Sequence, residues 1–138
     1  MHDKGMTPPG FHTATPYLSI EGAARAIEFY KTAFGATDLE RHSDPDGRIR
    51  HAQFKIGDSP FMISDYFGEY QYMKSVQMYG GSPVNIFLYV DDADAVFQQA
   101  LAAGAKQLTA MADLDYGRSG GVTDPFGIQW WLCTAPSK

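Results

Sequence analysis

The sequence predicts an α+β protein built from two consecutive β-α-β-β-β modules. The main observation is an internal repeat, because an alternating stretch followed by an amphipathic helix occurs at 15–34 and again 70 residues later at 85–104. Each half also carries an Asp-Pro-x-Gly turn, at 44–47 and at 124–127. We expect a single domain with module 1 at about 14–65, a linker at 66–83 and module 2 at about 84–134.

The first module begins with residues 15–20, which alternate between polar and apolar side chains as a half-buried strand does. A stripe of apolar residues at helical spacing follows, formed by Ala23, Ala26, Ile27, Tyr30 and Phe34. Gly35 is a favourable residue for the end of that helix. Three strands should come next, at 37–42, 48–56 and 61–65.

The second module repeats this order. Residues 85–90 alternate, Asp91-Asp92 offers a helix N-cap, and an apolar stripe predicts a helix at 93–104. Strands should follow at 106–111, 116–124 and 129–133. Consecutive side chains of a strand point to opposite faces, so Trp130 and Trp131 should lie on opposite faces of the last one.

The composition excludes several classes of function. A net charge of −5 and a pI near 5.2 argue against nucleic acid and against an anionic membrane as partners. Cys133 is the single cysteine, so neither an internal disulfide nor a zinc site made of cysteines is expected. No apolar run approaches the roughly 20 residues of a membrane helix, and we do not expect the first residues to act as a signal peptide. We therefore expect a cytoplasmic protein.

Five short motifs carry a resemblance to a known family. They are Ala-Ile-Glu-Phe-Tyr at 26–30, Phe-Gly-Ala at 34–36, Arg-His-Ala at 50–52, Val-Asp-Asp-Ala-Asp at 90–94 and Asp-Pro-Phe-Gly at 124–127. In this order, over about 14–134, they resemble the glyoxalase/bleomycin-resistance/extradiol-dioxygenase (vicinal oxygen chelate) superfamily and its PhnB-like branch. The resemblance implies that the curved sheets of the two modules form a cup. It also implies a homodimer, because a second subunit often completes such a cup.

The resemblance also says where a metal would bind. In the metal-dependent members, each module supplies a His or Gln from its first strand and a Glu or similar residue from its last. The matching positions here are Thr15, Asn85, Trp131 and a position near Ser64. Divalent metals prefer carboxylate, amide or imidazole ligands, so this set predicts no metal site. A divalent metal held by His51 and unconventional partners stays open as an alternative.

The strand faces opposite the aliphatic side chains carry rings and neutral hydrogen-bonding groups, which is how pockets for small organic molecules are built. The predicted ligand-binding residues on them are Tyr17, His51, Gln53, Asn85, Phe87, Gln129 and Trp131. Arg118 is a further candidate, either as a clamp for a carboxylate or phosphate or as an ordinary surface arginine. His51 is the best candidate for a catalytic acid or base, although no acidic or nucleophilic partner is evident in the sequence.

Two functions follow from these residues. The first is metal-independent binding of a small organic molecule, in the manner of resistance proteins that sequester a drug. The alternative is a lyase, isomerase or dioxygenase of the same superfamily that uses a divalent metal. A third reading, in which the cup is vestigial and the protein acts through its dimer, also stays open. The Tyr-rich linker at 66–83 is a candidate lid or dimer contact.

Overall fold

The computed structural model describes residues 7–69 and 72–137 and confirms the predicted fold class, with the same order of elements in each half. The first half contains β1 (Tyr17–Ser19), α1 (Ala23–Phe34), β2 (Thr37–Ser43), β3 (Ile49–Ile56) and β4 (Ser59–Ser64). The second contains β5 (Ile86–Tyr89), α2 (Ala93–Ala103), β6 (Lys106–Leu114), β7 (Gly117–Thr123) and β8 (Gln129–Thr134). A short 3-10 helix, η1 (Val76–Tyr79), lies in the linker between them.

Each half forms its own four-stranded sheet. Sheet A has the order β1-β4-β3-β2, and sheet B has the order β5-β8-β7-β6. In both, the first strand runs parallel to the last strand, and the remaining pairs are antiparallel. The shared topology is the structural form of the repeat in the sequence.

The two helices begin and end at the predicted signals. The Oδ1 of Asp92 accepts the Ala95 amide at 3.0 Å, which confirms the predicted N-cap of α2. Gly35 ends α1 with a left-handed φ of 72°, a conformation that glycine adopts without strain. Neither these nor any other helix of the described residues is long and apolar enough to span a membrane.

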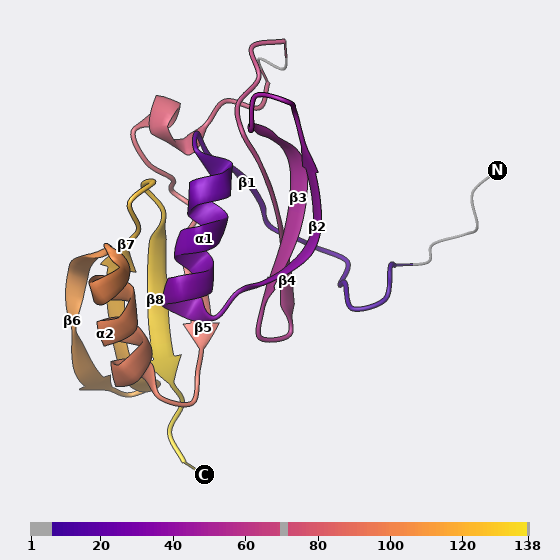
Figure 1. Ribbon diagram of the computed structural model, residues 1–138. Coiled ribbons are helices and arrows are strands. Elements are labelled where there is room, and N and C mark those ends of the chain that lie inside the picture. Colours follow the sequence, from indigo (N-terminus) through magenta and orange to yellow (C-terminus); the bar gives the residue numbers. More distant parts are fainter. Residues whose placement is uncertain (1–6, 70–71, 138) are drawn as a thin grey trace.

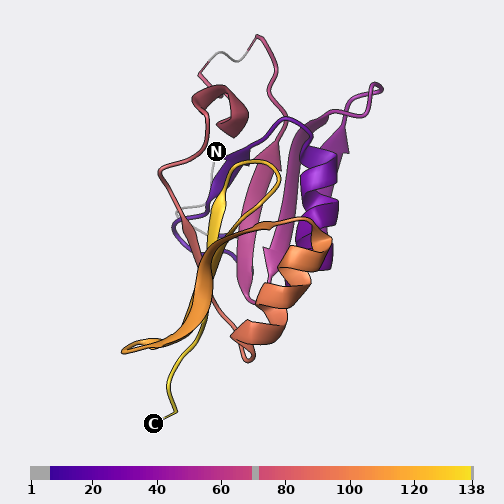
Figure 2. The same ribbon diagram turned by 90° about the vertical axis from the view of Figure 1, so that its left-hand side faces the viewer.

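The helix-covered faces of both sheets meet in one core. Trp130 of β8 is fully buried, and its ring lies 4.7 Å from that of Phe34, 5.0 Å from Tyr30 and 5.8 Å from Phe61 of β4. Figures 1 and 2 show α1 and α2 side by side in the angle between the two sheets. The face of each sheet that no helix covers therefore points away from this core, and the two uncovered faces point in different directions.

A buried carboxylate fastens the two modules together. Asp124, in the turn before β8, accepts the Tyr30 hydroxyl at 2.7 Å and the Trp130 indole at 2.8 Å. It also accepts the amides of Phe126 and Ile128, at 2.8 and 3.0 Å. Burial, together with the negative charge of Asp124 and its hydrogen bond, raises the pKa of Tyr30. Tyr30 thus stays protonated and links α1 to the second module.

The second part of the linker is fixed against the first module. The Gln77 side chain accepts the Glu21 amide at 2.9 Å and donates to the Glu21 carbonyl at 2.8 Å. Ser19 of β1 donates to the Met73 carbonyl at 3.0 Å, and Val76 is buried. Residues 70–71, which belong to the predicted lid or dimer contact, lie outside the described residues.

Candidate functional site

The uncovered face of sheet A carries a row of hydrogen-bonded neutral side chains. The Tyr17 hydroxyl lies 3.0 Å from Nδ1 of His51, and Nε2 of His51 lies 3.2 Å from the Gln53 carboxamide. The strand register produces this row, because Met62 of β4 pairs with both Tyr17 of β1 and Gln53 of β3. Three of the predicted site residues are therefore brought together on one face.

The imidazole of His51 serves here as a bridge between two neutral groups. A neutral imidazole has one donor and one acceptor nitrogen, so its tautomer decides which way the Tyr17 hydroxyl points its hydrogen. In either tautomer, Tyr17 retains hydrogen-bonding capacity toward the open side of the sheet, since a hydroxyl both donates and accepts. This arrangement is suited to holding the polar edge of an uncharged ligand.

Two further polar residues extend the row on the edge strand. His42 of β2 lies opposite His51, and Glu40 lies opposite Gln53, with Nε2 of His42 3.3 Å from the Glu40 carboxylate. His42 was not predicted as a site residue. The pairing depends on a register shift between His42 and Ser43, which the spacing of the turn does not reveal.

The uncovered face of sheet B carries aromatic rings instead. Phe87 of β5 lies opposite Trp131 of β8, and the Trp131 indole donates to the Asn85 carboxamide oxygen at 2.8 Å. The Phe87 ring lies 5.1 Å from Tyr89 and 6.2 Å from Tyr116. Tyr89 and Tyr116 were not predicted as site residues. The alternation of 85–90 already placed Tyr89 on this face, whereas Tyr116 lies in a turn and follows no period.

Gly121 lets the Trp131 ring lie flat across the sheet. The two residues are opposite each other on β7 and β8. A Cβ added at Gly121 would lie 2.8 Å from two carbon atoms of the Trp131 ring, closer than real Cβ contacts allow. Position 121 of β7 therefore needs a glycine beneath the ring, and it was not predicted as part of the site.

The remaining two predicted residues are not part of these clusters. Gln129 lies at the start of β8 opposite Thr123 and is half-buried. Arg118 binds Asp94 of α2 through two hydrogen bonds of 3.1 Å, and hydrogen bonding to Asp94 raises the pKa of Arg118. An arginine clamp for a ligand would first have to break this bidentate pair, so the structure does not bring Arg118 to the site.

The residues at the metal positions that the resemblance implies do not fit a divalent metal. The indole of Trp131 offers no lone pair to a metal, and the Asn85 oxygen already accepts its N–H. Thr15 and Ser64 supply only hydroxyl groups, and Ser64 is buried. Within residues 7–69 and 72–137, no group of three or more His, Cys, Asp or Glu side chains is arranged to hold a metal ion.

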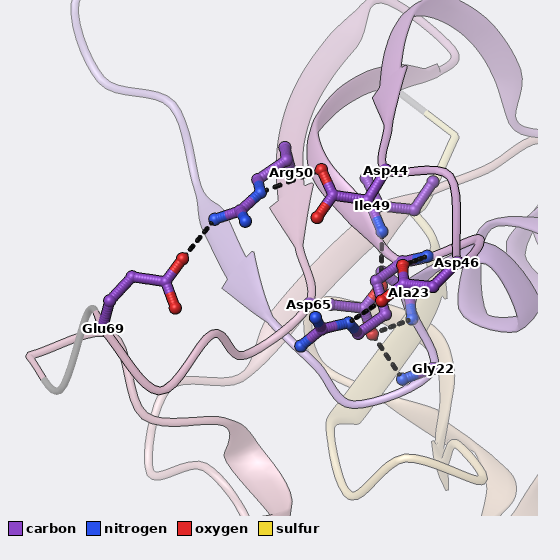
Figure 3. Close-up of polar contacts among 9 residues, drawn as sticks. Gly22, Ala23, Asp44, Asp46, Ile49, Arg50, Asp65 and Glu69 are labelled. Carbon is purple, nitrogen blue, oxygen red and sulfur yellow. Dashed lines mark hydrogen bonds and ion pairs between the residues drawn. The ribbon is translucent and has the colours of Figure 1, made fainter.

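A buried carboxylate behind sheet A positions the strand that carries His51. Asp65 accepts the amides of Gly22 and Ala23 at the start of α1, at 2.8 and 3.1 Å, and the amide of Ile49 in β3 at 2.7 Å (Figure 3). It therefore points to the helix side of the sheet, away from the uncovered face.

Nearby, Arg50 joins the turn before β3 to the start of the linker (Figure 3). Its guanidinium lies 3.0 Å from Asp44 and 2.7 Å from Glu69, and it stacks 3.7 Å from the centre of the Phe67 ring. Together with Asp65, these contacts hold the N-terminal end of β3 in place.

Comparisons with known proteins identify the relatives of this chain. Residues 11–132 match the Glyoxalase/Bleomycin resistance protein/Dioxygenase superfamily. An uncharacterized protein of Mycobacterium bovis is 44% identical over 121 residues, which cover 86% of this chain and 80% of that protein.

Two solved structures share the fold. The first is a putative 3-demethylubiquinone-9 3-methyltransferase, a PhnB protein from Bacillus cereus. It has a TM-score of 0.70 at 20% identity and covers 90% of this chain and 100% of its own. The second is TnmS3, an antibiotic binding protein from Streptomyces sp. CB03234. It has a TM-score of 0.68 at 22% identity and covers 91% and 96%. The match over 11–132 and the two four-stranded sheets agree, and the chain belongs to the glyoxalase/bleomycin resistance protein/dioxygenase superfamily.

Proposed function

We propose that this chain binds small, uncharged organic molecules that contain aromatic rings, without the help of a metal. The observation that carries the proposal is the composition of the two uncovered sheet faces. One presents the Tyr17, His51 and Gln53 hydrogen-bonding row, and the other presents the Phe87 and Trp131 rings. A flat ligand would stack on the rings while its polar edge bonds to the row.

The proposal includes a homodimer, because the two faces point in different directions within one chain. Sheet A of one chain would face sheet B of its partner, and each dimer would hold two equivalent sites. The exposed rings of sheet B support this arrangement, since Tyr89 is 70% exposed, Tyr116 50% and Phe87 42%. Contiguous exposed rings of this kind mark interaction surfaces.

The relatives support a binding role. TnmS3 is an antibiotic binding protein with the same fold, and the superfamily includes proteins of bleomycin resistance. The single cysteine and the acidic composition are in keeping with a cytoplasmic location, which belongs to the proposal as well.

The first experiment is a thermal-shift screen with uncharged aromatic compounds. A ligand at a hundredfold excess over its Kd should raise the melting temperature by about 9 °C, because it binds only the folded state. Trp131→Ala should abolish the shift, and Gly121→Ala should reduce it by displacing the Trp131 ring. Met78→Ala, which removes an exposed apolar side chain on η1, is the control. A hit that persists unchanged in Trp131→Ala would place the ligand elsewhere.

Two further measurements test the other parts of the proposal, which are the homodimer and binding without a metal. Tyr89→Glu introduces a charge among the rings of sheet B and should convert a dimer to monomers in sedimentation analysis, with loss of ligand binding. Elemental analysis of the purified protein should show less than one metal ion per ten chains. Stoichiometric zinc, nickel, manganese or iron that is lost in His51→Ala would instead support the metal-dependent enzyme.

A further inference from the structure

A separate cavity lies where the two modules join. It has a volume of about 730 Å³ and is lined by residues of β1, of β5, of the linker between the modules and of the turn before β8. Figure 2 shows the linker descending from η1 past β1 to β5. The walls of this junction cavity come from both halves of one chain, unlike the two uncovered faces described above.

The cavity remains open because two sheet edges approach each other without pairing. β1 is the edge strand of sheet A, and β5 is the edge strand of sheet B. Pro16 and Pro83, which precede these strands, both line the cavity. Proline has no amide hydrogen to donate, so it discourages the pairing of edge strands that would fill the space.

The lining is predominantly apolar and reaches from the core to the surface. Leu18 and Ile128 form part of the buried floor, being 8% and 4% exposed. Tyr79 and Val84 are 67% and 66% exposed on the walls, and Tyr17 is 41% exposed. Large apolar side chains that stay accessible around a hollow are typical of a site that a ligand covers.

One charged side chain faces this apolar surface. Among the described residues that line the cavity, Lys74 alone is charged, and no carboxylate is present. The chain as a whole carries a net charge of −5, so a cavity lining with one cation and no carboxylate differs in sign from the overall charge of the chain. A single cation beside apolar walls favours a ligand with one negative charge and an apolar body.

We propose that the junction cavity binds an amphipathic organic anion, with the apolar body between β1 and β5 and the anionic group at Lys74. Its volume of about 730 Å³ is that of a pocket for a molecule of drug size. This site goes beyond the proposed function, because it takes an anion, lies within one chain and uses neither Trp131 nor Phe87. Tyr17 borders both sites, so occupation of the cavity is expected to influence the hydrogen-bonding row of sheet A.

The test uses two fluorescent probes of nearly the same shape. 1-Anilinonaphthalene-8-sulfonate carries a negative charge, whereas N-phenyl-1-naphthylamine is neutral. The sulfonate should bind at one molecule per chain, and Lys74→Gln should weaken its affinity about five- to tenfold, the effect of losing one partly exposed charge pair. Lys74→Arg should retain the affinity. Binding of the neutral probe should be the same in Lys74→Gln as in the unaltered protein.

Two further variants locate the probes. Val84→Trp fills the cavity from its exposed wall and should abolish binding of both probes, with an unchanged circular dichroism spectrum. Lys106→Gln removes an exposed lysine of β6 that does not line the cavity, and it should leave both affinities unchanged. Trp131→Ala should also leave them unchanged, so loss of the cup ligand and loss of the anion are separate results.

Three outcomes would overturn the proposal. In the first, Val84→Trp and Lys74→Gln bind the sulfonate with the same affinity as the unaltered protein. In the second, Trp131→Ala loses binding of the sulfonate. Alternatively, Val84→Trp would convert a dimer to monomers in sedimentation analysis, which would mean that a second copy of the chain covers the cavity.

Discussion

The two Asp-Pro-x-Gly turns share one backbone conformation but have different roles. In the first, the Asp44 amide donates to the Arg48 carbonyl at 2.8 Å, and the Gly47 amide donates to the Asp44 carbonyl at 2.9 Å. In the second, the corresponding distances are 2.8 Å from Asp124 to Ile128 and 3.2 Å from Gly127 to Asp124. The repeated sequence thus reproduces the repeated main chain.

The side chains of the two aspartates lie in opposite environments. Asp44 is partly exposed and pairs with the guanidinium of Arg50. Asp124 is 4% exposed, and its two oxygens accept from Tyr30, Trp130 and two turn amides. The turn motif therefore determines the local backbone, whereas the neighbouring module determines which partners the carboxylate binds. In the second module, the carboxylate of the turn connects the two halves through its hydrogen bonds to Tyr30 and Trp130.

The largest loss of stability is expected when the hydrogen bonds of Asp124 are removed. Asp124→Ala leaves four buried donors without an acceptor and should lower the free energy of unfolding by about 4 kcal/mol or more, since each unpaired buried group costs about 1–3 kcal/mol. Asp44→Ala removes a partly exposed ion pair and should cost about 1 kcal/mol or less. Urea denaturation of the two variants measures both values. Similar losses in the two variants would contradict the assigned difference between the turns.

Side chains that lie outside the helices but accept amides at the helix N-termini extend the comparison. Asp65 in the first module accepts three backbone amides, whereas Thr134 in the second accepts only that of Ala93, at 2.8 Å. Asp65→Ala should therefore lower the free energy of unfolding by about 3 kcal/mol, and Thr134→Ala by about 1 kcal/mol. Asp65→Asn, which keeps one acceptor oxygen, should fall between them. Equal losses for Asp65→Ala and Thr134→Ala would show that the extra amides add no stability.

Much of the fold could be predicted because its signals are local. α1 occupies Ala23–Phe34, as its apolar stripe and the following glycine indicate. Strand alternation also placed Trp130 in the core and Trp131 on the uncovered face. β6 runs to Leu114, beyond the predicted end at 111, because register shifts after Gln107 and Thr109 disrupt the alternation that would mark its length.

The arrangement of the candidate site could not be predicted, because it depends on contacts between the modules. Alternation identifies the face on which Tyr17 or Phe87 lies, but it does not say how the two faces are oriented toward each other. That orientation follows from the packing of Trp130 against Phe61 and α1. Within the second module, the pairing of Arg118 with Asp94 also escaped prediction, because it joins a strand to a helix 24 positions away in the sequence.

A smaller effect concerns the pH dependence of stability that Tyr30 of α1 causes through its contact with Asp124. Burial, followed by the charge of Asp124, raises the pKa of Tyr30, whereas the matching position in α2 is the buried Ala100. A raised pKa stabilises the fold while the tyrosine is protonated, so this contribution is present below about pH 10, the ordinary value in the unfolded chain. It is lost as the pH rises from there through the raised pKa.

Tyr30→Phe removes one donor from Asp124 and should cost about 1–2 kcal/mol at neutral pH. The variant should also lack the part of the alkaline loss that Tyr30 causes, whereas Tyr116→Phe, at an exposed position, should retain it. Chemical denaturation between pH 7 and roughly pH 11, around the ordinary tyrosine pKa, measures the two curves. Parallel curves for Tyr30→Phe and the unaltered protein would remove Tyr30 as the source of the alkaline loss.

The smallest effect compares the surface ion pairs of the two helices. Hydrogen bonding to Lys31 lowers the pKa of Asp38, and Asp94 pairs with Arg118 in the second module. The Asp38 side chain is 44% exposed, so solvent screens the pair, and Asp38→Asn should cost about 0.5 kcal/mol or less. A lowered pKa means that this contribution is present above about pH 4 and is lost as the pH falls through the lowered value.

Asp94→Asn should cost a similar amount despite its bidentate partner, and about 1 M salt should abolish both differences because it shortens the screening length. A loss above roughly 1 kcal/mol in either variant, measured by urea denaturation at low salt, would show that the pair belongs to a less screened network than its exposure indicates.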